Sequence, residues 1–196
     1  MRAEPCDSVP AWKRAEDLAA AVLLLAALLL PGLVVGAMIV VESGWPPLFR
    51  QRRIGLCGKE FLMWKFRSLP RSTPQVAKSD LGDVAARATA LGRLLRRTSI
   101  DEFPQLLNVI VGDMSLVGPR PALFNQTELT EMRMRQGVLR VLPGLTGLAQ
   151  VSGRENLTLD HKVELDALYV RTMSPAVDIG IAFRTIGAVM SGRGNR

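Results

Sequence analysis

The longest apolar run of the sequence lies near its N-terminus. Residues 18–41 (LAAAVLLLAALLLPGLVVGAMIVV) form 24 consecutive positions without a charged side chain. A straight helix over this run would be roughly 36 Å long at a rise of 1.5 Å per residue, and the hydrocarbon core of a bilayer is about 30 Å thick. A helix buried in a soluble protein normally keeps a polar face, which this run lacks. The pattern therefore predicts a membrane-inserted helix.

A proline and the flanking charges bear on how this helix meets the membrane. Pro31, followed by Gly32, lies near the middle of the run, where a proline removes a backbone hydrogen bond and kinks or breaks a helix. Basic residues flank both ends: Lys13 and Arg14 before the run, and Arg50, Arg52 and Arg53 after it. Because cytoplasmic flanks are the ones enriched in Lys and Arg, both ends favour the same side. We predict a re-entrant helix hairpin broken at Pro31, with a simple membrane span as the alternative.

The rest of the chain alternates between short extended and helical patterns. Residues 46–69 contain two extended runs around a glycine-containing turn at 55–58, which predicts a β-hairpin. Apolar residues recur with helical spacing over 84–97, 124–139, 159–173 and 178–190, and the last segment suits a membrane surface as well as a protein core. The expected fold class is α+β, mainly helical, with amphipathic interfacial helices. Residues 1–45 are expected to form the membrane-inserted re-entrant helix, and residues 46–196 a small cytosolic domain.

Charge narrows the class of partner. The chain carries a formal net charge of +7, with a pI near 10.2, which favours an anionic partner: nucleic acid, an acidic membrane surface or a phosphorylated substrate. The basic residues of the expected hairpin form a solvated face, rest on anionic lipid or contact a phosphate. Charge alone does not choose among these.

Two adjacent carboxylates, Asp101 and Glu102, stand at the start of an apolar helical pattern in TSIDEFPQLLNVIVGDMSLVGPRP, residues 98–121. Ser99 and Glu102 match a capping box, whereas capping by Asp101 places Pro104 in the first helical turn, where proline is tolerated. In either register both carboxylates lie at a helix N-terminus, where the macrodipole favours the ionised form. Capping alone is therefore a sufficient structural interpretation.

The same pair also suits phosphoryl-transfer chemistry. An ionised aspartate is a nucleophile toward phosphorus if the repulsion between the two anions is neutralised, and magnesium held by carboxylates and substrate phosphates does this. Arginine supplies a rigid fork that matches phosphate geometry. Arg120 lies between Pro119 and Pro121, which restrict its backbone, and Arg96 precedes the acidic pair. The residues by themselves leave capping and phosphoryl transfer both open.

Several long motifs, in order along the chain, resemble those of one enzyme family. The stretches FRQRRIG, KFRSL, RRTSIDEFPQLLNVIVGDMSLVGPRP and PGLTGLAQVSGR are similar to the bacterial sugar transferases, the monotopic phosphoglycosyl transferases, in their small form. The similarity extends over about residues 13–190. It implies an enzyme that transfers a sugar phosphate from a UDP-sugar to polyprenyl (undecaprenyl) phosphate, giving polyprenyl diphosphate sugar and UMP. This is the first membrane step of a bacterial glycan pathway, such as exopolysaccharide or glycoconjugate biosynthesis.

The resemblance also implies roles for individual residues. Asp101 is expected to be the nucleophile that forms a covalent phosphosugar, and Glu102 to hold Mg²⁺, alone or together with Asp101. Four residues are expected to bind substrate phosphate: Arg96, Arg120, Lys65 and Arg154. Two more are active-site candidates: Asp166 and Asp178.

The implied partners are a UDP-sugar, polyprenyl phosphate and the phospholipid of the bacterial inner (cytoplasmic) membrane, with the catalytic domain on the cytosolic face. No nucleic acid is expected, and a homodimer is left open. Two alternatives from other classes are a non-catalytic membrane-tethered basic module that binds anionic lipid or nucleic acid, and a magnesium-dependent phosphohydrolase. The sequence does not predict which sugar is transferred.

Overall fold

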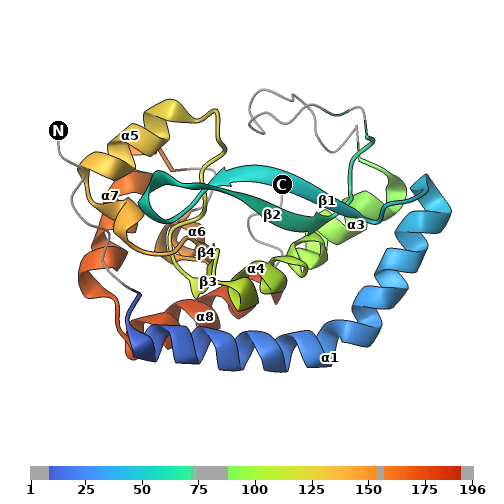
Figure 1. Ribbon diagram of the computed structural model, residues 1–196, viewed down its shortest axis with the longest axis horizontal. Coiled ribbons are helices and arrows are strands. Elements are labelled where there is room, and N and C mark those ends of the chain that lie inside the picture. The colour runs from blue at the N-terminus through green and yellow to red at the C-terminus, as the bar shows by residue number, and fades with distance from the viewer. Residues whose placement is uncertain (1–8, 72, 74–87, 154–156, 191–196) are drawn as a thin grey trace.

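The protein is described by a computed structural model over residues 9–71, 73, 88–153 and 157–190, and this part of the chain is mainly helical (Figure 1). The helices are α1 (Ala11–Ser43), α3 (Ala90–Thr98), α4 (Gln105–Val111), α5 (Thr127–Arg135), α6 (Leu148–Ser152), α7 (Leu159–Thr172) and α8 (Pro175–Met190). The strands are β1 (Leu48–Ile54), β2 (Glu60–Phe66), β3 (Ser115–Val117) and β4 (Gly144–Thr146), and short 3₁₀ helices are η1 (Leu56–Gly58), η3 (Ile100–Glu102) and η4 (Val138–Arg140). The predicted α+β class is confirmed.

The apolar N-terminal segment forms one helix, α1, of 33 residues with Pro31 inside it. Figure 1 shows that α1 first runs along the lower edge of the molecule and then bends upward toward the hairpin and α3. A proline in a helix interior removes a backbone hydrogen bond and crowds the preceding turn, which explains a bend in this helix. The helix is thus bent rather than divided into two, and the placement of both ends on one side of a membrane stays a prediction.

Most of the surface of α1 is apolar and exposed. Its most apolar 18-residue window has a mean hydropathy of 2.8, and only 6% of that window is buried. Leu30 is 72% exposed and Val41 is 89% exposed. By length and composition α1 can cross a membrane, and its exposure is the opposite of that of a buried core helix. An exposed apolar surface of this size fits membrane association.

One side of α1 packs against the rest of the protein. Ala21 belongs to a buried cluster with Leu106 and Val109 of α4. Arg14 donates hydrogen bonds to the carbonyl oxygens of Val109, at 2.5 Å, and Ile110, at 2.7 Å, near the C-terminal end of α4. Carbonyls in the last turn of a helix lack intrahelical partners, and here Arg14 bonds to two of them, although the Val109 carbonyl also accepts from Gly112 N–H at 3.2 Å. Beyond the bend, a second buried cluster joins α1 to β2 and α3.

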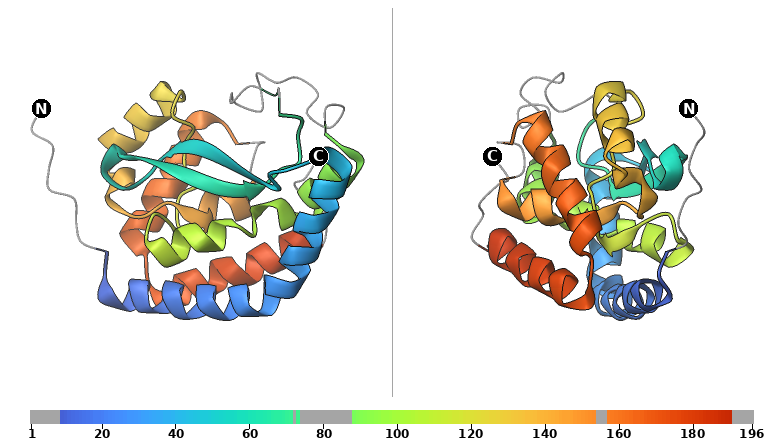
Figure 2. Two further views of the ribbon diagram at one scale, coloured as in Figure 1. Left: turned by 45° about the vertical axis from the view of Figure 1, so that its right-hand side comes forward. Right: turned by 90° about the vertical axis from the view of Figure 1, so that its left-hand side faces the viewer.

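The predicted hairpin is confirmed. Strands β1 and β2 pair antiparallel, from Leu48 opposite Phe66 to Ile54 opposite Glu60, and η1 lies in the predicted turn. Figures 1 and 2 show the hairpin along the side of the molecule opposite to the first part of α1. The same pairing places Lys65 of β2 toward η3, where it meets Glu102.

The parallel pair β3–β4 brings together two motifs that are far apart in the sequence. Gly118 N–H donates to the Thr146 carbonyl at 2.8 Å, and Gly144 N–H donates to the Pro119 carbonyl at 2.9 Å. A Cβ atom added to Gly144 would lie 2.1 Å from Gly118 N, and one added to Gly147 would lie 2.1 Å from Gly118 O. The segments VGPRP and PGLTG therefore touch through their backbones, and glycine is required because no side chain fits between them.

The remaining predicted helices exist, with changed ends. The structure begins α3 at Ala90, where the Thr89 side chain caps it, and residues 84–87 of the predicted helix lie outside the described residues. The helix predicted over 124–139 is shorter, since α5 spans Thr127–Arg135. The two helices predicted near the C-terminus are confirmed as α7 and α8. On α8, Phe183 is 70% exposed, but the interfacial position of this helix stays a prediction.

A buried amide joins the hairpin to α4, and its removal gives a test of the fold. Asn108 is fully buried: its Oδ1 accepts from Trp64 N–H at 3.0 Å, and its Nδ2 donates to the Leu62 carbonyl at 2.8 Å. Asn108→Ala should lower the free energy of unfolding by about 2–4 kcal/mol, because it leaves buried backbone groups of β2 without partners. Thermal denaturation in detergent micelles measures this. The exposed Asn125→Ala is the control, and equal midpoints for the two variants would contradict the assignment.

Candidate active site

The acidic pair lies in η3, the short 3₁₀ helix between α3 and α4. Ser99 ends α3 in the left-handed conformation, with φ of 58°, and no side chain among the described residues caps η3 or α4. Helix α4 begins at Gln105, directly after Pro104. Both capping interpretations of the sequence are therefore wrong, although the pair does lie just before a helix as predicted. The carboxylates are left available for interactions other than capping.

Glu102 is held by two cations from distant parts of the chain. Lys65 Nζ on β2 lies 2.9 Å from Glu102 Oε1. Arg120, three residues after β3, approaches the same oxygen with Nη2 at 2.5 Å and Oε2 with Nη1 at 3.4 Å. Burial raises the pKa of Glu102, but the charges and hydrogen bonds of Arg120 and Lys65 outweigh burial and hold that pKa well below its ordinary value. Glu102 is therefore a fixed anion.

Asp101, the adjacent residue, lacks the ion pairs that hold Glu102. It is 6% exposed, and its carboxylate makes no hydrogen bond or ion pair within the described part of the chain. Burial raises its pKa, and the nearby charge of Glu102 adds to this effect, while Lys65, Arg96 and Arg120 oppose it. This differs from the expectation of an exposed carboxylate ionised by a helix dipole. Asp101 keeps its lone pairs uncommitted, as a nucleophile must.

The surrounding cations have different origins. Lys65 comes from the hairpin, and burial lowers the pKa of its ammonium group, opposed mainly by Glu102. Arg96 lies in the last turn of α3, and its charge acts on Asp101. The structure thus brings together five of the predicted site residues: Asp101, Glu102, Lys65, Arg96 and Arg120. A cluster of three cations around two carboxylates favours a further anion, such as a phosphate.

Asp166 lies behind this cluster rather than in it. Its Oδ2 accepts from Arg133 Nη2 at 2.6 Å and from Arg133 Nε at 3.0 Å, and both side chains are buried. Arg133 Nη1 in turn donates to the Arg120 carbonyl at 2.7 Å. Within the described part of the chain, Asp166, predicted as an active-site residue, is therefore linked to the site through Arg133.

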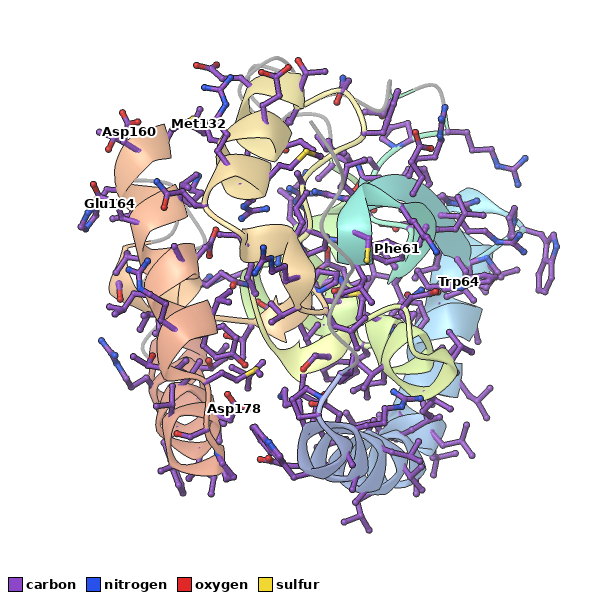
Figure 3. All side chains as sticks on the ribbon, turned by 60° about the vertical axis from the view of Figure 1, so that its left-hand side comes forward. Phe61, Trp64, Met132, Asp160, Glu164 and Asp178 are labelled. Atoms are coloured by element: carbon purple, nitrogen blue, oxygen red, sulfur yellow. The ribbon has the colours of Figure 1, made fainter. Side chains whose placement is uncertain are left out.

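Asp178 belongs to a separate buried cluster. Its Oδ2 lies 2.6 Å from Lys13 Nζ, and its Oδ1 accepts from the Tyr169 hydroxyl at 2.9 Å. Figure 3 shows Asp178 where α8 faces α1, whereas Asp160 and Glu164 lie on the outer edge of α7. The described interactions of Asp178 tie α1, α7 and α8 together and do not reach the acidic pair. Arg154, the remaining candidate, lies outside the described residues.

Two arginines near the site were not predicted as site residues. Arg53 on β1 donates from Nη1 to the Pro121 carbonyl at 2.8 Å, and Arg133 on α5 donates to the carbonyl of Arg120. The basic stretch FRQRRIG gave a signal for Arg53, since contact with a phosphate was one of its interpretations. No local pattern singles out Arg133, because its partner Asp166 is 33 positions away.

The contrast between the two carboxylates predicts opposite effects on stability. Glu102 has a lowered folded pKa, so its ionised form contributes stability that is fully present above its unfolded pKa of about 4.3 and is lost as the pH falls from there toward the lower folded pKa. Glu102→Gln should therefore lower the free energy of unfolding at pH 7 by about 1–3 kcal/mol, since two cations lose their anion. This deficit should shrink as the pH falls to about 4.

Asp101 has a raised folded pKa, so its ionised form costs stability above its unfolded pKa of about 3.9. Asp101→Asn removes this cost, and its thermal midpoint at pH 7 should equal or exceed that of the unmodified protein. Thermal denaturation of both variants at pH 7 and pH 4 measures the difference. Equal destabilisation by the two substitutions at pH 7 would show that the carboxylates are held alike.

Known proteins are similar to this chain over most of its length. The family profile described as bacterial sugar transferase matches residues 9–192. The uncharacterized sugar transferase EpsL of Bacillus subtilis is 42% identical over 183 residues, which are 93% of this chain and 89% of that protein. A UDP-glucose:undecaprenyl-phosphate glucose-1-phosphate transferase of Caulobacter vibrioides is 41% identical, over 95% of this chain and 73% of that protein.

A protein of the same printed name from Escherichia coli is 40% identical over 89% of this chain, but the matched region is only 39% of its length. The chain thus spans nearly all of one relative and about two fifths of another. The alternatives of a non-catalytic basic module and of a phosphohydrolase have no such support from the named relatives. From its sequence and its matches over almost the whole chain, this protein belongs to the bacterial sugar transferase family.

Proposed function

We propose that this enzyme transfers a sugar phosphate from a UDP-sugar to undecaprenyl or a related polyprenyl phosphate, by way of a covalent phosphosugar on Asp101. The observation that carries the proposal is the difference between the two acidic residues. Glu102 is ion-paired with two cations, while the neighbouring Asp101 forms no ion pair or hydrogen bond among the described residues. The printed names of relatives from Caulobacter vibrioides and Escherichia coli, UDP-glucose:undecaprenyl-phosphate glucose-1-phosphate transferase, support the same reaction.

In the first step, an oxygen of ionised Asp101 attacks the phosphorus that bears the sugar. A new bond forms between this oxygen and phosphorus, and the bond from phosphorus to the oxygen of UMP breaks. UMP leaves with the bonding electron pair, and the aspartate carries the phosphosugar as an acyl phosphate. The raised pKa of Asp101 makes its ionised oxygen more basic than that of an ordinary aspartate, which favours attack while Lys65, Arg96 and Arg120 offset the charge of the substrate phosphates.

In the second step, a phosphate oxygen of the polyprenyl phosphate attacks the same phosphorus. The bond to Asp101 breaks, the carboxylate is regenerated, and the product is a polyprenyl diphosphate sugar. Lys65, Arg96 and Arg120 stand where they can stabilise the negative charge that gathers on the phosphoryl oxygens in both steps. A magnesium ion, when bound, would further neutralise the diphosphate.

The residues present fit such an ion. Magnesium is usually bound by one or two carboxylates together with substrate phosphates, and Asp101 and Glu102 offer two adjacent carboxylates. Among the described residues, no group of three or more Asp, Glu, His or Cys side chains is placed to hold a metal ion. Glu102 would hold the ion, alone or together with Asp101, and the Glu102 oxygens would be shared with the two cations.

The exposed apolar surface of α1 supports a position in the bacterial inner membrane, with the remaining residues on the cytosolic side. The bend in α1 and the cations at both of its ends favour the re-entrant arrangement over a span. In that arrangement the exposed apolar residues of α8, such as Ile179 and Phe183, contact phospholipid. The acceptor, whose chain lies in the bilayer, is then brought to the site from the membrane.

The nucleophile is tested by Asp101→Asn in purified protein with a panel of UDP-sugars, polyprenyl phosphate and Mg²⁺. UMP release should fall by about 10³-fold or more, because an amide oxygen does not form the covalent intermediate. Release of UMP is measured by coupled assay or chromatography. The matched control is Asp160→Asn on the exposed face of α7, which should keep the unmodified rate.

Retention of the normal rate by Asp101→Asn would refute the nucleophile. The two rival functions have other signatures. A phosphohydrolase would make free sugar phosphate without a lipid acceptor, whereas a binding module would release no UMP from any UDP-sugar.

The topology is tested by single cysteines at exposed positions on either side of α1, Ala11→Cys or Lys59→Cys, in a background in which the native Cys6 and Cys57 are replaced by Ser. Both should be shielded from a membrane-impermeant thiol reagent added outside intact cells and should react after the cells are opened. Labelling is read by mass shift, relative to the protein without added cysteines. External labelling of one position and not the other would show that α1 spans the membrane.

A further inference from the structure

Two consecutive carbonyl groups of the Pro-Arg-Pro segment each accept a hydrogen bond from a guanidinium. Arg133 Nη1 donates to the Arg120 carbonyl at 2.7 Å, and Arg53 Nη1 donates to the Pro121 carbonyl at 2.8 Å. The donors come from α5 and from β1, so two separate elements hold one short stretch of backbone. The stretch is the one from which the Arg120 side chain leaves toward Glu102.

Arg133 is itself fixed. Its side chain is 3% exposed, and two of its nitrogens bond to the same Asp166 oxygen, at 2.6 and 3.0 Å. The pairing neutralises the buried charge, which would otherwise be costly to bury. The third bond, to the Arg120 carbonyl, therefore comes from a guanidinium whose direction is already set by Asp166.

Arg53 differs in that its described partners carry no charge. Its Nε and Nη2 donate to Gln51 Oε1 at 3.2 and 2.6 Å, and its Nη1 donates to the Pro121 carbonyl. Burial, reinforced by the charge of Arg120, lowers the pKa of this guanidinium to about 9, so it remains cationic at neutral pH. Burying a cation whose described acceptors are neutral costs free energy, which its three hydrogen bonds offset in part.

Backbone contacts next to Arg53 also attach β1 to the Pro-Arg-Pro segment. Arg53 forms a β-bridge with Leu123, and Ile54 N–H donates to the Ala122 carbonyl at 2.9 Å. The end of β1 is thus attached to the chain directly after Pro121. On the other side, the Pro119 carbonyl accepts from Gly144 N–H. The carbonyls of residues 119, 120 and 121 are all held, and the two prolines fix their own φ angles.

We propose that Arg53 and Arg133 are positioning residues for the transfer reaction: they clamp the carbonyls of Pro121 and Arg120 and thereby aim the Arg120 guanidinium at Glu102 and at the substrate phosphate. The role rests on the proposed function, since it acts through Arg120. Asp166 serves the same clamp by orienting Arg133. A guanidinium displaced by about 1 Å would lose much of its effect on the phosphoryl group.

A double-mutant cycle separates positioning from other roles. Arg53→Met is made in the unmodified enzyme and in Arg120→Lys, which keeps a cation but loses the fork that positioning serves. In the unmodified enzyme, Arg53→Met should lower kcat/KM for UMP release by about 10- to 100-fold, and in Arg120→Lys by less than about 3-fold. Arg133→Lys should behave in the same way.

Equal fold losses in both backgrounds would overturn the proposal, because Arg53 would then act independently of Arg120, as a direct substrate contact or as a general stabiliser. Thermal midpoints are measured for every variant. Arg53→Lys, which keeps the charge but has one donor nitrogen in place of three, replaces Arg53→Met if the latter does not fold, and the same comparison between backgrounds decides the outcome.

The control is Arg52→Met, next to Arg53 on the same strand. Arg52 pairs with Glu60 at the surface, where the two side chains are 53% and 45% exposed, so its loss should leave kcat/KM within about 2-fold. Absence of UMP release by the unmodified enzyme would refute the proposed function itself. An active enzyme with equal losses in both backgrounds would refute only the clamp.

Discussion

The arrangement of this site depends on the binding of Glu102 between Lys65 and Arg120. The ion pairs join three segments that are distant in sequence: strand β2, the 3₁₀ helix η3 and the loop after β3. Glu102, Lys65 and Arg120 are all partly buried, and each would be costly to bury as an unpaired charge. The ion pairs therefore require the three segments to lie together. The hairpin, the parallel β3–β4 pair and the buried side of α1 can each be understood as supports that hold these partners in place.

The ion pairs of Glu102 leave the neighbouring Asp101 without a direct partner among the described residues. Because Lys65 and Arg120 are occupied with Glu102, Asp101 receives their charge at a distance without a direct hydrogen bond to either within the described residues. A direct ion pair would lower the reactivity of Asp101, and an absence of cations would leave it protonated or repel a phosphate. Asp101 and Glu102 carry the same carboxyl group, so their different roles come from the residues that surround each of them.

The sequence predicted those parts of the structure that depend on local pattern. The hairpin followed from its turn at residues 55–58, the long apolar helix from its composition, and the proximity of Arg120 to the acidic pair from a resemblance of whole motifs. The capping interpretation, one of the two that the residues left open, was wrong, because the left-handed Ser99 that ends α3 has no local signal. The Arg133–Asp166 pair and the position of Asp178 beside Lys13 depend on tertiary packing, which spacing along the chain does not encode.

The central claim, that Asp101 carries the phosphosugar, is tested most directly by trapping the intermediate. The enzyme is mixed with a UDP-sugar without lipid acceptor, quenched in acid and digested, and the peptides are weighed by mass spectrometry. We predict the added mass of one sugar phosphate on the peptide that contains Asp101, formed together with UMP and lost when polyprenyl phosphate is added before the quench. A burst of UMP with the added mass on another residue, or UMP release only when the acceptor is present, would contradict the account.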